Sequence, residues 1–299
     1  MNMLSGVIDL PKGFRSGDIL AYHRRDAQEI SERVSAAGLE KGLVWAGRPA
    51  RLAIAFADGH AAFRLDIDGA ASPGGLHALE RTARRMLGLT QDTTGFEAAH
   101  RGHPLLGPLI ARRPDLRVAV AATPFDALAW AITGQQISVG AALSIRRRLI
   151  AATGEPHSGG LRCHPTPERV AALAAEELRG FGFSLSKANT LLRLSAAVAA
   201  GDLPLDAWAA APDAEEIGAA LRALPGIGPW TVNYALLRGF GCVDGSLHGD
   251  VAVRRNLRRL LRRDDKISEK ETETWLAPFS PWRALAAAHL WAMQADDGY

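Results

Sequence analysis

The position of one carboxylate, Asp250, would allow it to take part in catalysis. The residues after it, from Val251 through Leu257 and Leu260, have apolar spacing typical of a helix, so Asp250 is expected at the helix start. A carboxylate fixed there would stay ionised, could stabilise a cationic transition state and could orient a water molecule. The same position suits a simple helix N-cap, which contributes about 1 kcal/mol. The residues alone leave both interpretations open.

A second segment, residues 224–231, reads Leu-Pro-Gly-Ile-Gly-Pro-Trp-Thr. Gly226 and Gly228 let the backbone turn tightly and approach a ligand closely, and the N–H groups after Pro229 face an anion-binding position. A DNA phosphate would fit there. An ordinary connection between two helices also needs glycine, so this pattern does not decide the matter by itself.

Basic side chains gather in two arginine clusters. The formal net charge is +3 and the sequence pI is about 9.1, and arginine is a good phosphate ligand. The larger cluster comprises Arg254, Arg255, Arg258, Arg259, Arg262 and Arg263, and the smaller comprises Arg146, Arg147 and Arg148. Such runs are also typical of solvated helix faces, so they do not name a partner.

The composition excludes several classes of protein. With 299 residues and 47% hydrophobic content, the chain can bury the cores of two or three domains. Its two cysteines, Cys163 and Cys242, cannot build a disulfide framework or a four-thiolate metal or iron–sulfur site. The N-terminus lacks a secretory pattern and no charge-free stretch is long enough to span a bilayer. We therefore expect a cytoplasmic protein with no membrane partner.

The elements that would position these residues change in type along the chain. Strand patterns occur at 43–45, 51–56 and 62–67, and Asp58-Gly59 predicts a hairpin between the last two. A helix follows, with apolar residues from Leu76 to Leu87 and a stop at Gly88. Prolines and glycines interrupt any pattern between residues 100 and 115, so a domain linker is expected over 95–124.

Beyond residue 124 every element is expected to be helical. Helix starts are indicated by Thr123-Pro124 with Asp126 as a capping box, Thr166-Pro167, Ser268 with Glu271, and Ser280-Pro281. Glycines at 154, 180, 201 and 239 are expected to end the helices that begin near residues 125, 167, 185 and 229.

Three blocks in order give the chain a family resemblance. They are Ala-Ile-Thr-Gly-Gln-Gln-Ile-Ser at 131–138, the segment 224–234, and Ser-Leu-His-Gly-Asp at 246–250 before a basic helix. The chain resembles the helix-hairpin-helix base-excision glycosylases, and within them the bacterial DNA-3-methyladenine glycosylase II enzymes. Weaker matches at 22–26, 31–34, 182–189 and 281–291 extend the resemblance over nearly the whole chain.

The resemblance implies a mostly α fold, in which two helical domains follow an N-terminal mixed α/β domain. Residues 1–98 would form the α/β domain with an antiparallel sheet. Residues 99–124 and 243–299 would form one helical domain. Residues 125–242 would form the other and carry the helix-hairpin-helix at 215–238.

The resemblance also implies an activity, that of a monofunctional DNA glycosylase in base excision repair. Such an enzyme excises alkylated, cationic bases such as 3-methyladenine by hydrolysing the N-glycosidic bond, with Asp250 as the catalytic carboxylate. Related glycosylase/lyases carry a nucleophilic lysine where this chain has Trp230, so Schiff-base chemistry lacks its amine. The iron–sulfur loop of another branch is also missing, since no cysteine follows Cys242.

The implied site residues fall into three groups. The base pocket would comprise Trp230, Tyr234, Trp291 and Tyr22; for a lone Trp or Tyr in a helix, a place in the hydrophobic core is the more common alternative. The DNA contacts would comprise Gly226, Ile227, Gly228, Thr231, Gln135, Gln136 and Arg254, with Gln136 at the position that fills the gap left by a flipped nucleotide. The hairpin carbonyls of Arg222, Leu224 and Ile227 would hold a structural Na⁺ or K⁺. No other cofactor is expected, and the partner would be double-stranded DNA containing alkylated bases, bound by a monomer.

Two alternatives stay open. One is a glycosylase for oxidised or mismatched bases, which would read neutral bases by hydrogen bonds. The other is a non-catalytic helix-hairpin-helix module that grips DNA phosphates, although such a scaffold has no use for Asp250 or the glutamine block. His248 has no role in any of these interpretations.

Overall fold

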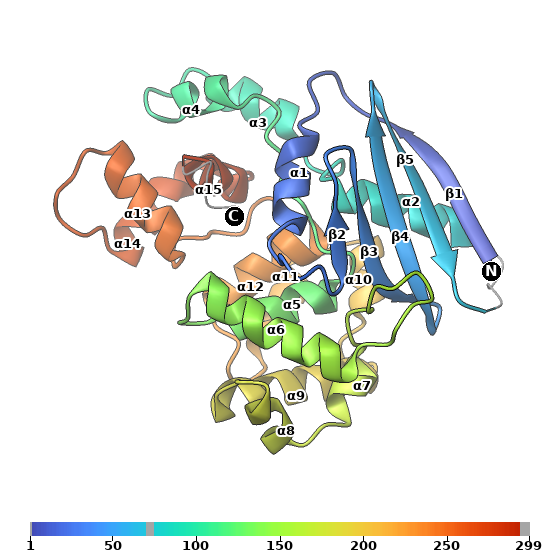
Figure 1. Ribbon diagram of the computed structural model, residues 1–299. Coiled ribbons are helices and arrows are strands. Elements are labelled where there is room, and N and C mark those ends of the chain that lie inside the picture. The colour runs from blue at the N-terminus through green and yellow to red at the C-terminus, as the bar shows by residue number, and fades with distance from the viewer. Residues whose placement is uncertain (1, 70–74, 294–299) are drawn as a thin grey trace.

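The structure is a computed structural model that describes residues 2–69 and 75–293 (Figure 1). A twisted sheet lies at one end of the molecule, helices α13 to α15 lie at the other, and α5 to α12 fill the space between and below them. Among the described residues, no helix combines the length and the apolar character needed to cross a membrane.

The sheet is antiparallel and its five strands run in the order β1-β5-β4-β3-β2. The strands are β1 Asn2–Asp9, β2 Glu32–Val34, β3 Gly38–Trp45, β4 Arg48–Ala57 and β5 His60–Ile67. The three strands expected from the sequence are confirmed as β3, β4 and β5. The hairpin at Asp58-Gly59 is confirmed too, since Ala57 pairs with His60.

Strands β1 and β2 were not expected from the sequence. Strand β1 lies at the edge of the sheet and leaves Met3 and Val7 about 60% exposed (59% and 60%), so it lacks a continuous apolar run. Strand β2 has only 3 residues, too few to show an alternating pattern.

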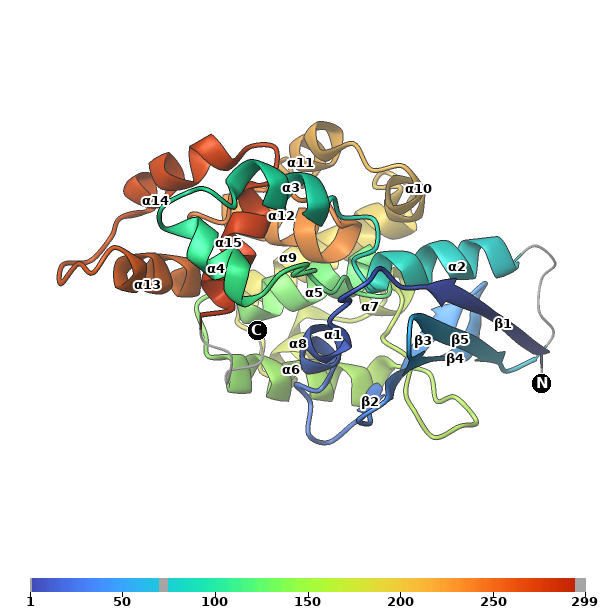
Figure 2. The same ribbon diagram turned by 90° about the horizontal axis from the view of Figure 1, so that it is seen from above.

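Two helices cover the sheet. Helix α1 Ser16–His23 packs on β2 and β3, and α2 Gly75–Met86 lies along the sheet against β1 and β5 (Figure 2). The expected helix stop after α2 is confirmed, because Gly88 has a φ of +67°.

The segment that the sequence suggested was an irregular linker contains helices. Helix α4 Leu106–Arg112 lies within the expected linker 95–124, and helix α3 Thr93–His100 overlaps its start. In α4, Leu109 and Ile110 are buried, while Gly107 and Pro108 obscure the pattern. Because Pro108 lies in the first turn, where a backbone N–H has no helical partner, it does not break the helix.

In the rest of the described chain the regular elements are helices, joined by loops, and one loop contains an isolated β-bridge between Pro156 and Arg162. The helices are α5 Pro124–Gly134, α6 Val139–Thr153, α7 Pro167–Ala171, α8 Ala175–Gly180, α9 Leu185–Ala199, α10 Leu205–Ala210, α11 Ala214–Arg222, α12 Pro229–Ala235, a π-helical turn Leu236–Phe240, α13 Val251–Leu260, α14 Glu269–Leu276, a 3-10 turn Ala277–Phe279 and α15 Arg283–Trp291.

The helix starts are confirmed in part. Thr123 and Thr166 cap α5 and α7, and Ser268 forms a capping box with Glu271. The capping box proposed for Asp126 is wrong, because its carboxylate bonds Lys41 instead. The start proposed at Ser280 is also wrong, because α15 begins at Arg283 and the Ser280 hydroxyl donates to Asp244.

The helix expected to run from residue 125 to Gly154 is two helices. Helix α5 ends at Gly134, Gln136 takes a left-handed φ of +56°, and the Ser138 hydroxyl caps α6 by accepting the Ala141 N–H. The expected helix from Pro167 to Gly180 is likewise divided, into α7 and α8. In each case a side chain starts a new helix within one apolar pattern: Ser138 caps α6, and Glu177 accepts the Ala174 N–H at the start of α8.

Three hydrophobic cores hold these elements. One lies under the sheet with α1 and α2, a second lies among α5 to α12, and the third lies among α3, α4 and α13 to α15. The domain boundaries given above stay a prediction.

The third core contains a buried histidine, His289 of α15. It is 3% exposed and stacks on Phe96 with ring centroids 5.5 Å apart. Burial, helped by the charge of Arg113, lowers the pKa of His289 to about 4. Burial also lowers the pKa of His164 to about 4.

Acidification from pH 7 to pH 4 is therefore expected to destabilise the protein. Histidines in the unfolded chain bind protons near pH 6.5, but the buried ones do so only near pH 4, so the unfolded state binds more protons in this window. Each buried histidine should cost roughly 2 to 3 kcal/mol at pH 4. In urea unfolding, His289→Gln should show a shallower loss of stability between pH 6.5 and 4, whereas His60→Gln, at an exposed site, should follow the wild type. Identical slopes for the wild type and His289→Gln would contradict this assignment.

Candidate active site

The turn between α11 and α12 has the geometry that only glycine allows. Gly226 has a φ of +94°, and a Cβ there would lie 2.0 Å from the Thr190 hydroxyl oxygen. Gly228 is the N-cap of α12 and Pro229 is its first residue. The side chains of Ile227 and Thr231 are buried, so they can offer only backbone groups to a ligand.

A loop between α5 and α6 is tied to this turn. The Gln135 side-chain amide donates to the carbonyl oxygen of Gly226 at 3.1 Å and to the Thr231 hydroxyl at 3.0 Å. Gln136 beside it is exposed and so are Ile137 and Val139, each 37%. The two exposed apolar side chains were not singled out from the sequence, although their place after the glutamines was visible there.

Asp250 is the N-cap of α13 and is held by four donors. Its Oδ1 accepts the backbone N–H groups of Ala252 and Val253 at 2.9 and 3.0 Å and the Trp291 indole N–H at 3.1 Å. Its Oδ2 accepts the Trp230 indole N–H at 3.0 Å. The carboxylate is only 8% exposed. A buried carboxylate with this many donors is fixed in position and remains a strong acceptor.

The expected aromatic residues meet around this carboxylate. Trp230 packs on Tyr234 with centroids 5.3 Å apart, and Trp230 and Trp291 both point their N–H groups at Asp250. Tyr22 joins them through Arg238, whose guanidinium lies 4.5 Å from the Tyr22 ring centroid and 5.4 Å from that of Trp291.

Sequence reasoning missed Arg238. It is 5% exposed, donates to the Ala119 carbonyl at 2.9 Å, and burial lowers its pKa. A single arginine inside the apolar run 235–240 was the available signal, because a buried arginine needs partners. Burial likewise raises the pKa of Tyr22, so its phenol stays protonated.

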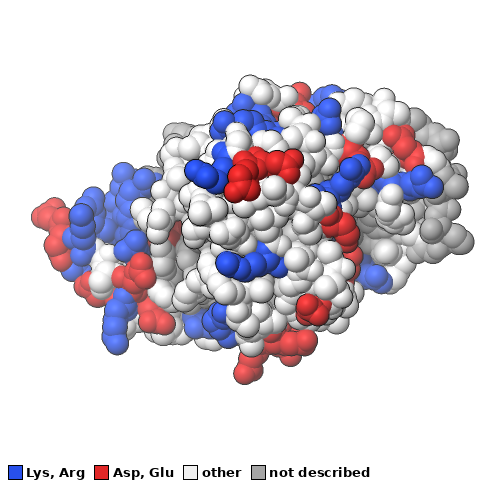
Figure 3. Space-filling view, turned by 90° about the horizontal axis from the view of Figure 1, so that it is seen from below, with Lys and Arg blue, Asp and Glu red and all other residues white. Residues whose placement is uncertain are grey.

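The arginines of α13 lie beside this site. Figure 3 shows basic side chains gathered at the end of the molecule that α13 and α14 form. Arg254 is half-buried, with an Nη2 atom 3.8 Å from Glu269. Arg263 is engaged by Asp265 and Glu271 and is not available to a ligand in this arrangement.

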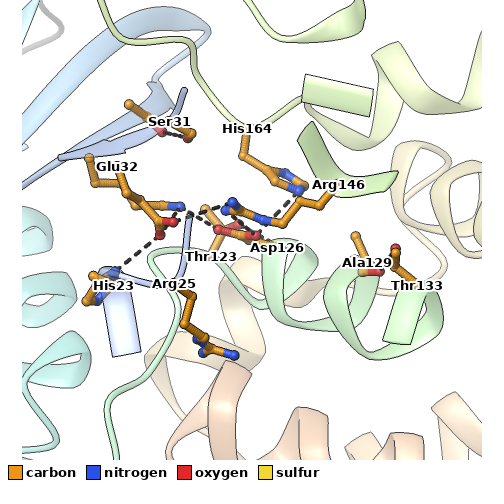
Figure 4. Close-up of polar contacts among 12 residues, drawn as sticks. His23, Arg25, Ser31, Glu32, Thr123, Asp126, Ala129, Thr133, Arg146 and His164 are labelled. Atoms are coloured by element: carbon orange, nitrogen blue, oxygen red, sulfur yellow. Dashed lines mark hydrogen bonds and ion pairs between the residues drawn. The ribbon is translucent and has the colours of Figure 1, made fainter. Parts of the chain in front are cut away.

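A buried ion cluster fastens the sheet to the helices next to Tyr22. Lys41 of β3 lies 2.9 Å from Glu32 and 2.7 Å from Asp126 of α5, and Arg146 of α6 lies 3.4 Å from Glu32. His23, the residue after Tyr22, contacts Glu32 at 3.2 Å. Figure 4 shows side chains of this cluster converging from α1, the sheet, α5 and α6: His23, Glu32, Asp126 and Arg146.

The charges in this cluster compensate one another. Burial opposes ionisation of Asp126 and Glu32, but the positive groups around them, Lys41 and Arg146 among them, hold the pKa of both carboxyls well below the usual range. No local sequence pattern indicated this cluster, because Lys41 and Asp126 are 85 residues apart.

A comparison with models of protein families identifies the family of this chain. A family model described as "HhH-GPD superfamily base excision DNA repair protein" matches residues 129–281, from within α5 to just before α15. The chain belongs to the HhH-GPD superfamily. The resemblance drawn from the three sequence blocks is thus confirmed.

Two known proteins are similar to larger parts of the chain. The Escherichia coli protein named DNA-3-methyladenine glycosylase 2 is 32% identical over 188 residues, which are 62% of this chain and 63% of that protein, so the chain spans less than two thirds of that relative. A 3-methyladenine DNA-glycosylase from Archaeoglobus fulgidus superposes with a TM-score of 0.80 at 20% identity, covering 97% of this chain and 98% of that one, and shows the shared fold.

A third similar protein was solved in complex with DNA. The structure of the Schizosaccharomyces pombe 3-methyladenine DNA glycosylase Mag1, in complex with abasic DNA, has a TM-score of 0.59 and 25% identity. It covers 69% of this chain and 98% of that one. For this chain, the half-helical fold with a five-stranded antiparallel sheet is shown, while the roles of individual site residues stay predictions.

Proposed function

We propose that this HhH-GPD superfamily member is a monofunctional DNA glycosylase that hydrolyses the N-glycosidic bond of alkylated bases such as 3-methyladenine. The observation that carries the proposal is Asp250, a buried carboxylate held by two backbone and two indole N–H groups among aromatic rings. Similarity to the Escherichia coli protein named DNA-3-methyladenine glycosylase 2 supports the same activity.

The chemistry begins with a base that carries a positive charge. As the bond between C1′ and the base nitrogen breaks, its electron pair passes to the base and cancels that charge, while positive charge develops on the sugar. Asp250 stabilises the sugar cation electrostatically because its four donors hold it in place before the reaction. A water molecule then adds to C1′ and its proton passes to Asp250 and on to solvent. The products are a free base and an abasic site.

The aromatic rings suit the proposed substrate. Trp230 and Trp291 direct their N–H edges at the carboxylate, and Tyr234 packs on Trp230. Guanidinium groups lie over the rings of Tyr22 and Trp291, and such ring faces attract a flat cation. We propose that these rings receive the base after it is flipped out of the duplex.

DNA would be held on both sides of the aromatic residues around Asp250. The backbone of Gly226, Ile227 and Gly228 would bind a phosphate, with Gln135 stabilising the turn and the Thr231 N–H facing the same direction. The exposed Gln136 would enter the gap left by the flipped nucleotide, and Arg254 would contact phosphate on the other flank. The partner would be double-stranded DNA containing an alkylated base, bound by one copy of the chain.

We further propose a Na⁺ or K⁺ at the hairpin carbonyls of Arg222, Leu224 and Ile227. The donor set fits, because neutral carbonyl oxygens suit hard monovalent cations, and the Leu224 carbonyl that accepts the Ile227 N–H at 3.1 Å has a second lone pair. The cation would make the turn more attractive to phosphate.

Release of free 3-methyladenine from a methylated duplex, measured by chromatography, tests this function. We expect the base to be released while the strand stays intact until hot alkali is added, because Trp230 stands where a lyase has its amine. Borohydride should trap no covalent adduct. Release of an oxidised base alone would instead support a glycosylase for oxidised lesions, and DNA binding without any release would support a non-catalytic module.

A further inference from the structure

A small cavity lies beside Tyr22, between its ring and that of Trp130. Its volume is about 30 Å³. The guanidinium of Arg25 lies 4.0 Å from the centroid of Tyr22 and 5.2 Å from that of Trp130. A space of this size holds one or two water molecules, or one small substituent of a larger ligand.

Three carboxylates line the cavity, and two of them are fully engaged. Glu32 contacts His23, Lys41 and Arg146, and Asp126 contacts Lys41, Arg146 and His164. Figure 4 shows these contacts, with Arg25 directed away from them. Both acids therefore serve the ion cluster and have no oxygen to spare for a ligand.

The third carboxylate, Asp26, differs because only one of its oxygens is engaged. It is 4% exposed, and its Oδ1 accepts the Gln28 N–H at 3.1 Å and lies 2.9 Å from the Nε of Arg147. Its Oδ2 is buried and has no hydrogen-bond partner among the described residues. An unsatisfied buried carboxylate oxygen is costly, so a donor is expected to complete it: water in the free protein, and a ligand group when one is bound.

On the basis of the proposed glycosylase function, we propose that Asp26 selects lesion bases that carry an exocyclic amino group on the edge entering this cavity. The amino group displaces the water and donates to Oδ2. N-methylated adenines have such a group. A base with a carbonyl on that edge, such as hypoxanthine, would place oxygen against oxygen and is disfavoured.

The surroundings of Asp26 suit the recognition of a base by hydrogen bonding. Its ion pair with Arg147 of α6 fixes the carboxylate, so its free oxygen keeps one direction. It follows Tyr22 by four residues, and both line the cavity from the C-terminal end of α1. Arg25, a flat delocalised cation that is half-buried, already stacks on Tyr22 and Trp130. The same rings can accept the flat cation of a methylated adenine when Arg25 turns outward.

The test is the ratio of two single-turnover excision rates, for 3-methyladenine and for hypoxanthine in the same duplex context. Asp26→Asn keeps the shape but offers an amide that can donate to a carbonyl, so the ratio should shift toward hypoxanthine by about tenfold to a hundredfold. Because one enzyme preparation is assayed on both substrates, partial unfolding lowers both rates alike and leaves the ratio unchanged.

Glu29→Gln is the matched control, since it makes the same carboxylate-to-amide change three residues away, at an exposed side chain that does not line the cavity. It should leave the ratio within about twofold of the wild type. An active wild type whose ratio is unchanged in Asp26→Asn would overturn the assignment of Asp26 and leave the glycosylase function standing. A wild type that releases neither base would overturn the proposed function and this proposal with it.

Discussion

Replacing Lys41 with methionine is expected to lower the free energy of unfolding by about 3 to 5 kcal/mol. Lys41 is 1% exposed and lies within 2.9 Å of Glu32 and 2.7 Å of Asp126. Methionine fills the space but leaves two buried carboxylates with too little positive charge around them. Removing one member of a buried ion network costs far more than the network contributes as a whole, because the remaining charges keep their desolvation penalty.

Urea unfolding at pH 7 measures this loss. Arg84→Met is the control, because it breaks the pair with Glu80, in which both side chains are more than a third exposed, and exposed pairs contribute about 1 kcal/mol or less. If Lys41→Met were no more destabilising than Arg84→Met, the cluster would be solvated and would not fasten the sheet to α5 and α6.

The sequence predicted those parts of the site that depend on local structure. Asp250 as a helix cap, the tight turn at Gly226 and the hairpin at Asp58-Gly59 each follow from a few adjacent residues with clear conformational preferences. The family resemblance then indicated which aromatic residues to consider with Asp250. The structure brings Trp230 and Trp291 within hydrogen-bond distance of it.

The parts that the sequence did not predict depend on long-range packing. The indole N–H groups that point at Asp250 come from 20 residues before it and 41 residues after it. The carboxylate of Asp126 looked like a capping box because it follows Thr123 by three residues, but Lys41 competes for it from the sheet. Nothing near Asp26 in the sequence indicated that one of its oxygens would be buried without a donor.

The predicted helix boundaries were wrong for a related reason. The apolar pattern continues through residues 125–154, yet the chain turns at Gln136, where Gln135 bonds the hairpin. A contact between segments about 90 residues apart overrides the local helical preference at that point. The break falls at the loop that we propose enters DNA.

Substitution of Asp250 by asparagine is expected to slow base excision about a hundredfold to a thousandfold. Asparagine caps helices about as well as aspartate, so its oxygen can keep the N–H groups of Ala252 and Val253. The negative charge that would stabilise the sugar cation is lost. The new amide nitrogen would face the Trp230 N–H, a mismatch that should cost on the order of 1 kcal/mol of stability.

A double variant separates these two effects. Trp230→Phe in the Asp250→Asn background removes the opposed N–H and should recover most of the lost stability. It should not recover the rate, because no carboxylate is restored.

The most direct measurement is single-turnover excision of 3-methyladenine by the wild type and by Asp250→Asn, with thermal melts of both proteins. We predict that the wild type releases the base from an intact strand and that the folded Asn variant is slower by two to three orders of magnitude. Near-wild-type rates from a folded Asp250→Asn protein would contradict the account, since Asp250 would then be a helix cap and no more.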